Sequence, residues 1–152
     1  SYHREYGLKF TSARPLNVYG PRQIGEGAIH NFIVNALKNE PLIIHQPGSQ
    51  IRSWCYVDDT VDALVRILST DKSEGEVFNI GNPQATSTTL QTAETIIRLS
   101  SSESKVQFKE IEYPEVNIRV PSIDKAKKIL GFMPKVSLEE GIKRTIDWYK
   151  QH

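Results

Sequence analysis

The run from Gln46 to Asp59 places a turn, a short apolar strand and a helix start directly one after another. Pro47-Gly48-Ser49 has turn composition, Ile51 to Tyr56 has strand composition, and Asp58-Asp59 opens a helical stripe, where carboxylates favour the helix dipole. Arg52 falls where the turn becomes the strand. Strand and helix continue to alternate along the chain, which predicts an α/β or α+β class.

Apolar spacing and capping signals predict the remaining elements. We expect the last turn of a helix at Ser1–Gly7, and further helices at about 28–39, 57–68, 88–100 (a Thr88/Gln91 capping box), 122–131 (capped by Ser122 and stopped by Gly131) and 137–149 (a Ser137/Glu140 capping box). We expect strands at 8–15, 42–44, 51–56, 77–80 and 106–111, a turn at 17–21, and pairing of 42–44 with 51–56 as a small ribbon. The run 77–80 is typical of a parallel sheet.

Composition narrows the class of protein. The chain has 152 residues, which fits one domain, and its net charge of +1 argues against a nucleic-acid partner. The lone Cys55 rules out an internal disulfide and suits a reducing compartment. The sequence has neither an apolar run of membrane-spanning length nor a signal peptide, so we expect no membrane contact and a cytoplasmic location.

Several catalytic and binding motifs are missing from the sequence. The segment Gly20 to Gly27 has no Lys-Ser/Thr pair after Gly25, so it is not a P-loop, and its glycines do not have the G-x-G-x-x-G spacing either. No Tyr-x-x-x-Lys occurs. The four histidines are scattered and Cys55 stands alone, so we expect no metal site. A nucleophilic pair of Cys55 with a histidine has no local sequence signature.

Four segments in order carry a family resemblance. They are Ala13-Arg14-Pro15-Leu16-Asn17-Val18-Tyr19-Gly20-Pro21, the run from Gly48 to Asp59, Phe78-Asn79-Ile80-Gly81, and Asp124-Lys125-Ala126-Lys127-Lys128-Ile129-Leu130-Gly131-Phe132. Together they resemble the C-terminal half of the NAD-dependent epimerase/dehydratase family, the extended short-chain dehydrogenases that act on nucleotide sugars. The run Arg-Ser-Trp-Cys-Tyr-Val-Asp-Asp looks closest to the decarboxylase, dehydratase and epimerase branches. The run does not distinguish among these three branches.

The resemblance implies a fold and a missing part. Residues 1–152 would form a single partial domain, with the last strands of a Rossmann sheet (Lys9–Arg14 and Val77–Ile80) and a small mixed α/β substrate lobe. In that family the Gly-rich dinucleotide loop and the catalytic Tyr-x-x-x-Lys precede the matched region. We therefore expect no catalytic residue in this chain. NAD or NADP would serve the full-length protein, and this chain alone would not bind it tightly.

The resemblance also assigns binding roles. Arg52 would reach the diphosphate of the nucleotide sugar, which agrees with the bidentate geometry of a guanidinium; the alternative is a surface arginine paired with Asp58 or Asp59. The other substrate-binding candidates are Asn17, Asn31, His45 and Arg119, and the cofactor-binding candidates, through backbone near the nicotinamide, are Val18, Tyr19 and Gly20. Asn17 would otherwise bond its own turn, and His45 would otherwise be a solvent-facing edge residue.

Arg119 is where the chain departs from the family pattern. Many members carry Pro-x-Arg-x-Gly-Asp before the last matched segment, whereas this chain has no Gly-Asp and Arg119 is the arginine available there. Phe32 and at least one of Trp54 and Tyr56 are expected in the core. Asp59 is expected to be structural, as a helix-dipole partner and as an ion-pair partner of Arg52.

Three functions remain open from the sequence. The first is the substrate-binding part of an NAD(P)-dependent nucleotide-sugar epimerase, dehydratase or decarboxylase, with a UDP-sugar as the expected ligand. The second is a non-catalytic nucleotide-sugar-binding or assembly module. The third is a structural fragment without a ligand. Without the preceding part, strands Lys9–Arg14 and Val77–Ile80 would lose their sheet neighbours. Their exposed apolar edges and faces are expected to favour a homodimer or strand exchange.

Overall fold

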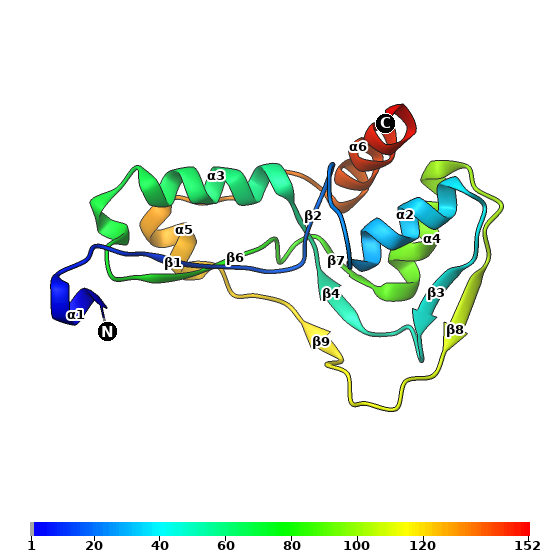
Figure 1. Cartoon of the computed structure of the whole chain (residues 1–152), viewed down its shortest axis with the longest axis horizontal. Coiled ribbons are helices and arrows are strands. Elements are labelled where there is room, and N and C mark those ends of the chain that lie inside the picture. Colours follow the sequence, from blue (N-terminus) through cyan, green and yellow to red (C-terminus); the bar gives the residue numbers. More distant parts are fainter. Residues whose placement is uncertain (1) are drawn as a thin grey trace.

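The computed structural model describes residues 2–152 and shows an elongated molecule in which two groups of elements meet near the middle (Figure 1). The helices are α1 (Tyr2–Tyr6), α2 (Ala28–Leu37), α3 (Val57–Leu68), the 3-10 turn η1 (Asp71–Ser73), α4 (Thr89–Ser100), α5 (Asp124–Leu130) and α6 (Leu138–Gln151). The strands are β1 (Ser12–Pro15), β2 (Val18–Tyr19), β3 (Leu42–His45), β4 (Ile51–Ser53), β5 (Cys55–Tyr56), β6 (Val77–Ile80), β7 (Thr86–Thr88), β8 (Val106–Lys109) and β9 (Ile118–Arg119).

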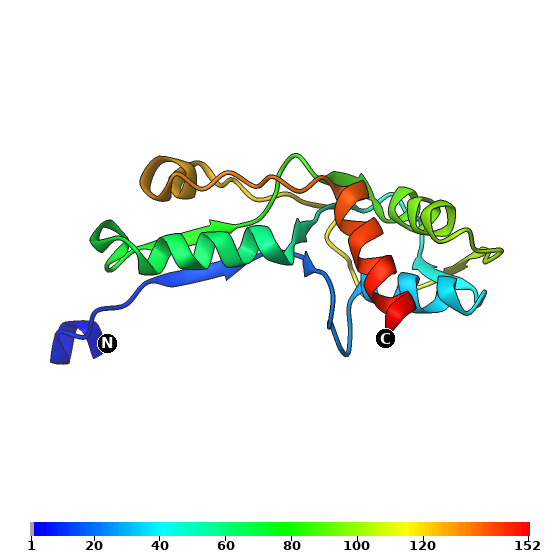
Figure 2. The same ribbon diagram turned by 90° about the horizontal axis from the view of Figure 1, so that it is seen from above.

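The first group is built on a parallel pair of strands. β1 and β6 run side by side with Ser12 opposite Val77 and Pro15 opposite Ile80, which confirms the parallel sheet predicted for 77–80. The strand predicted at 8–15 begins only at Ser12. α3 and α5 pack with this pair around a buried cluster that includes Phe78. Seen from above, α3 runs along the two strands (Figure 2).

The second group surrounds β4, which lies between two other strands. β4 pairs antiparallel with β7 and parallel with β9, while β3 pairs parallel with β8. α2, α4 and α6 pack together and enclose the larger buried cluster, in which Phe32 and Tyr56 lie. Phe32 is therefore a core residue, as predicted. The turn expected at 17–21 instead contains β2, which pairs with β5.

The ribbon predicted between 42–44 and 51–56 is wrong. The turn at His45–Gly48 is followed by bonds to the start of α4: Leu90 N donates to Gly48 O (3.1 Å) and Thr89 N to Gln50 O (3.0 Å). These bonds carry Ile51 away from β3 and toward β7. The single strand expected at 51–56 is likewise interrupted at Trp54, between β4 and β5.

The helix caps agree in part with those predicted from the sequence. The reciprocal Thr88/Gln91 capping box at α4 is confirmed. At α6, Ser137 Oγ accepts from Glu140 N, but the Glu140 carboxylate accepts from Arg144 Nε (2.7 Å), so only half of that box forms.

The ends of α5 and α1 test the remaining caps. Ser122 was predicted to cap α5, but the capping position is Ile123. Gly131 ends that helix with φ of 62°, as expected. The helix end predicted before Gly7 is present as α1, while Ser1 lies outside the described residues. Residues 2–152 contain no helix that combines the length and the apolar character needed to cross a bilayer.

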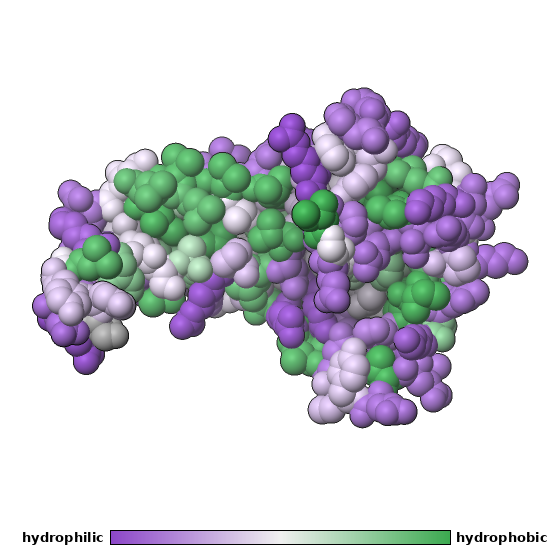
Figure 3. Space-filling view, viewed as in Figure 1, coloured by the Kyte–Doolittle hydropathy of each residue, from purple (hydrophilic) through white to green (hydrophobic). Residues whose placement is uncertain are grey.

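The apolar stripe of α3 faces outward. The sequence places this stripe on one helix face, but its members Val61, Leu64, Val65 and Leu68 are exposed, Leu68 by 86%. The buried face carries the smaller Ala63 together with Ile67. Figure 3 shows apolar side chains gathered over the part of the molecule that contains α3. An exposed contiguous stripe of this kind favours association.

We predict that this chain self-associates and that Val65→Lys weakens the association, because a lysine at the centre of the stripe opposes desolvation. Light scattering across a concentration series measures the mass. Gln151→Lys, an exposed change of the same charge on α6, is the matched control and should leave the mass unchanged. A wild-type chain that stays monomeric and monodisperse at every concentration would contradict the prediction.

Asp59 joins α3 to the segment before α6. Its Oδ1 accepts from Lys135 N (2.9 Å) and its Oδ2 from Val136 N (3.0 Å), and the residue is buried. The structural role predicted for Asp59 is therefore confirmed. Its predicted ion pair with Arg52 is wrong, because the Arg52 guanidinium binds Glu115 instead.

We predict that Asp59→Asn lowers the free energy of unfolding by about 1–3 kcal/mol, since an amide NH₂ would face a buried backbone N–H. Urea titration followed by circular dichroism measures the change. Asp58→Asn is the control. Asp58 is exposed, and its ion pair with Arg144 is long at 3.9 Å, so its replacement should cost less than about 0.5 kcal/mol. Equal effects of the two substitutions would refute the bridging role.

Candidate functional site

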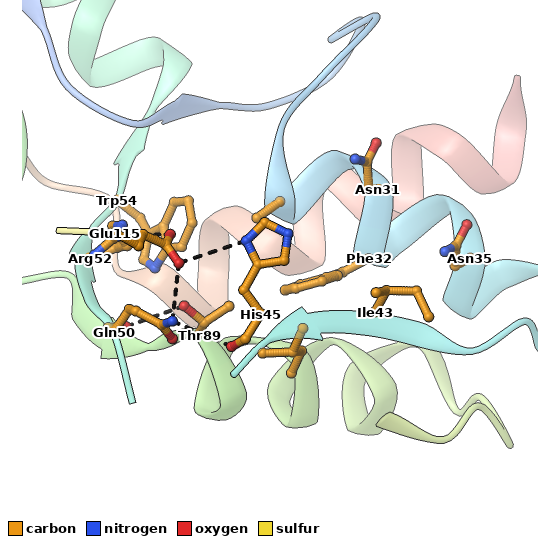
Figure 4. A pocket seen from close by; sticks show the side chains of 12 residues that line it. Asn31, Phe32, Asn35, Ile43, His45, Gln50, Arg52, Trp54, Thr89 and Glu115 are labelled. Carbon is orange, nitrogen blue, oxygen red and sulfur yellow. Dashed lines mark hydrogen bonds and ion pairs between the residues drawn. The ribbon is translucent and has the colours of Figure 1, made fainter. Parts of the chain in front are cut away.

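Alternate residues along the β4 region point into one hollow. Gln50, Arg52 and Trp54 are spaced two apart, all three are buried, and all three line a hollow of about 420 Å³. Successive side chains of a strand alternate between faces, so the spacing explains why these three share a side. α2 contributes Ala28, Asn31, Phe32 and Asn35; β3 contributes Ile43, Ile44 and His45; Thr89 and Glu115 complete the lining (Figure 4).

The electrostatic centre of this hollow is the pair of Arg52 and Glu115. Arg52 is 8% exposed, and its Nη2 donates to Glu115 Oε1 at 2.8 Å, while Nη1 donates to the Ile51 carbonyl at 3.0 Å. The predicted alternative of a surface arginine paired with Asp58 or Asp59 is therefore wrong.

Two more groups approach the same carboxylate. Gln50 Nε2 donates to Glu115 Oε2 at 3.1 Å, and His45 Nδ1 lies 3.7 Å from that oxygen (Figure 4). A guanidinium, an amide and an imidazole thus surround one anion. The guanidinium and amide donors suit any oxyanion, including a phosphate.

A second hollow adjoins the first across Arg52. It measures about 300 Å³ and is lined by Asn17, Val18, Tyr19, Gln23, Glu26, Gly27, Ala28, Ile29, Arg52 and Trp54. Ala28, Arg52 and Trp54 line both hollows. Arg52 therefore borders two spaces, one lined by α2 and β3 and the other by β2 and the start of α2.

Asn17 ties β2 to the break between β4 and β5. Its φ is 44°, its Nδ2 donates to the Ser53 carbonyl at 2.8 Å, and its own carbonyl accepts from Cys55 N. The amide thus bonds a different strand and not its own turn, so that alternative is wrong. Asn17 lines the second hollow, which keeps a sugar contact geometrically open.

The backbone candidates next to Asn17 have structural roles as well. Tyr19 is buried, its hydroxyl donates to the Leu138 carbonyl at 3.2 Å, and burial raises the pKa of its phenol well above the ordinary value. A methyl group on Gly20 would lie 2.6 Å from Val57 Cγ1, so packing against α3 explains that glycine. Val18 and Tyr19 line the second hollow, and the predicted contact with nicotinamide stays a prediction.

The remaining candidates divide between the hollow and the surface. Asn31 and His45 line the first hollow, and the His45 ring meets Tyr113 edge-on with centroids 6.4 Å apart. Arg119 lies directly across the β4–β9 pairing from Arg52. Its side chain is exposed and lines neither hollow. The structure therefore groups Asn31, His45 and Arg52, and it leaves Arg119 at the edge.

Sequence analysis missed Gln50 and Glu115. Gln50 was open to prediction, because a strand that carries Arg52 on one face also carries residue 50 there. Glu115 was not, because it comes from a segment without a motif and meets Arg52 only through the fold. Asn35 and Thr89 were missed in the same way: one lies within a helix and the other at a helix start.

Cys55 is packed into the interior and is not paired with a histidine. Its side chain is fully buried, its Sγ lies 3.4 Å from Thr60 Oγ1, and burial raises the pKa of the thiol. These surroundings suppress the thiolate, which is the reactive form. Across residues 2–152, no three or more His, Cys, Asp or Glu side chains cluster as a metal site.

Comparisons with known proteins agree with this geometry. The sequence model of the NAD dependent epimerase/dehydratase family matches residues 1–81. UDP-glucuronic acid decarboxylase 5 of Arabidopsis thaliana is 42% identical over 143 residues, which are 93% of this chain and 41% of that protein. The chain thus spans about two fifths of the length of this curated relative.

Solved structures of similar proteins include bound ligands. UDP-glucose 4-epimerase of Thermotoga maritima, solved with UDP-glucose, superposes with a TM-score of 0.91 at 37% identity, over 99% of this chain and 48% of that one. UDP-glucuronic acid 4-epimerase of Bacillus cereus, solved with UDP-glucuronic acid and NAD, gives 0.91 at 32% identity over the same shares.

We predict that Cys55 reacts with a thiol reagent far more slowly in the folded chain than in the unfolded one, because burial and the raised pKa both withhold the thiolate. Colour release from a disulfide reagent at pH 8, with and without guanidinium chloride, measures both rates. The unfolded chain should release one thiol per chain quickly. Equal rates in both states would show that Cys55 is accessible.

Proposed function

Because this chain belongs to the NAD-dependent epimerase/dehydratase family, we propose that it forms the nucleotide-sugar-binding part of an NAD(P)-dependent decarboxylase, epimerase or dehydratase. The predicted fold, the C-terminal part of an extended short-chain dehydrogenase, is confirmed by the parallel β1–β6 pair and by the structural similarity to the two epimerases. The ligand we propose is a UDP-sugar.

The position of Arg52 supports this proposal most directly. A nucleotide sugar has a base and ribose at one end, a sugar at the other, and a diphosphate between them. Arg52 likewise lines both the hollow bordered by α2 and β3 and the hollow bordered by β2. A planar guanidinium binds phosphate oxygens two at a time, which orients the diphosphate as well as attracting it.

The lining residues suit the two ends of such a ligand. In the larger hollow, the amides of Asn31 and Asn35 and the ring of His45 offer hydrogen bonds and a stacking face to a base. Gln50 Oε1 is buried and accepts no hydrogen bond from residues 2–152, so a ligand donor would satisfy it.

The sugar end and the second phosphate contact rest on two other residues. In the smaller hollow, Asn17 offers an amide to sugar hydroxyls. Arg119 is proposed as the second phosphate contact, since its exposed side chain sits on the strand beside Arg52 and is not fixed by burial.

NAD or NADP is proposed as the cofactor of a longer protein, where it would take up and return a hydride. The backbone of Val18 and Tyr19 borders the smaller hollow and fits a contact at one edge of nicotinamide. The 152 residues include no G-x-G-x-x-G loop and no Tyr-x-x-x-Lys. This chain would therefore bind and orient the substrate, while proton transfer and the main cofactor contacts would come from elsewhere.

Because the sequence has no Tyr-x-x-x-Lys, we retain a second candidate function, a non-catalytic nucleotide-sugar-binding or assembly module. An enzyme and a nucleotide-sugar-binding module would both bind UDP, so binding alone does not separate them. The reading frame before Ser1 does. A Gly-rich strand-turn-helix and a Tyr-x-x-x-Lys encoded there would support the enzyme, and a start codon immediately before Ser1 would support the module.

We predict that UDP binds this chain and that Arg52→Ala weakens the binding by about 2–4 kcal/mol, because the phosphate loses its charge-assisted partner. Isothermal titration calorimetry measures both affinities. A thermal melt of each protein confirms folding, since Arg52 is buried.

Arg98→Ala is the matched control. Arg98 is exposed on α4, pairs with Glu139 at 3.2 Å, and lines neither hollow, so its loss should leave the affinity for UDP unchanged. Absence of heat with a folded wild-type chain would reject the binding role. Equal weakening by both arginine substitutions would point to nonspecific charge attraction.

A further inference from the structure

The carboxylate of Glu115 holds the position that a phosphate needs beside Arg52. It takes the Nη2 donor of the guanidinium at 2.8 Å and the amide donor of Gln50 at 3.1 Å. A phosphate oxygen that binds Arg52 through Nη2 would compete for the same donor hydrogens. The carboxylate and a phosphate oxygen therefore exclude each other at this Nη2 donor.

The segment that carries Glu115 is fixed at its ends and loosely held between them. It connects β8 to β9, with Gln46 N bonded to the Lys109 carbonyl (3.0 Å) and Ile51 N bonded to the Asn117 carbonyl (2.7 Å). Between these ends, the side chains of Tyr113, Pro114 and Val116 are exposed. Figure 1 shows this stretch as an extended connection along the outer side of the molecule. The Glu115 side chain itself is only 28% exposed and turns inward to the arginine.

We propose that Glu115 is a gate for phosphate-bearing ligands: it neutralises Arg52 in the free chain and leaves the guanidinium when a diphosphate enters. The inference rests on the proposed nucleotide-sugar site and adds how that site selects its ligand. The gate moves as part of the 110–116 segment, so opening leaves the pairings of β8 and β9 intact.

The gate makes ligand selection depend on charge. A ligand without phosphate offers Arg52 no anion in exchange for Glu115, so opening would leave a buried cation unpaired. A diphosphate replaces the carboxylate with oxygens of higher charge, and its arrival restores the neutralisation. Because only the open fraction of the protein binds, the apparent affinity for a diphosphate is reduced by that fraction.

The test is a calorimetric titration of this chain with UDP, before and after Glu115→Gln. The substitution keeps the size of the side chain and removes its charge, so the closed state loses its ion pair. We expect UDP to bind about three- to tenfold more tightly to E115Q than to the wild type. Glu112→Gln, an exposed change of the same charge on the same segment, should leave the affinity unchanged.

Two further titrations check that the gate acts through the guanidinium and on the phosphate. In an Arg52→Gln background, Glu115→Gln should tighten UDP much less than it does in the wild type. The guanidinium for which the carboxylate competes is gone, and only the repulsion between Glu115 and the phosphates is relieved. Uridine, which has no phosphate, should gain nothing from E115Q. Binding of UDP that is unchanged or weaker in E115Q would overturn the gate while leaving the site. Absence of UDP binding to all the folded variants would overturn the proposed function and the gate together.

Discussion

A buried guanidinium is the constraint on which this structure depends. Arg52 lies on the central strand of the three-stranded sheet, with β7 on one side and β9 on the other, so its backbone cannot shift outward. A charge withdrawn from water is costly unless an opposite charge accompanies it. Since the arginine is held in place, the anion has to come to it, and Glu115 reaches it from 63 residues further along the chain.

The position of Arg52 relative to Asn17 depends on the junction between the two groups of elements. β2 and β5 pair there, α3 begins there, and the Asp59 carboxylate ties that beginning to the segment before α6. Close packing leaves little freedom: a methyl group on Gly141 would collide with the Tyr19 phenol. Tyr19, which lines the smaller hollow, is therefore held tightly against α6.

The sequence predicted what is decided locally. The Thr88/Gln91 box and the Gly131 stop follow from bonds within a few residues, so they were readable without the fold. Strand partners were not, because strands 42–45 and 51–53 are each too short to specify a neighbour by pattern. Within the site, the family resemblance pointed to Arg52, but its partner was invisible: Glu115 meets it through tertiary structure alone. The stripe on α3 was correctly placed on one helix face, but its spacing could not show that this face is exposed.

The contacts of Arg52 set folding and binding against each other. An internal carboxylate that neutralises the guanidinium stabilises the free chain, and the same stabilisation is subtracted from the affinity of any phosphate that replaces it. The ion pair does not satisfy every polar atom beside it, because Gln50 Oε1 accepts no hydrogen bond from any residue that the structure describes. Burying an acceptor without a donor has a cost that Glu115, itself an acceptor when ionised, cannot remove. A ligand that carries both a phosphate and a hydrogen-bond donor could replace Glu115 at the cation and also satisfy this oxygen, as a nucleoside diphosphate could.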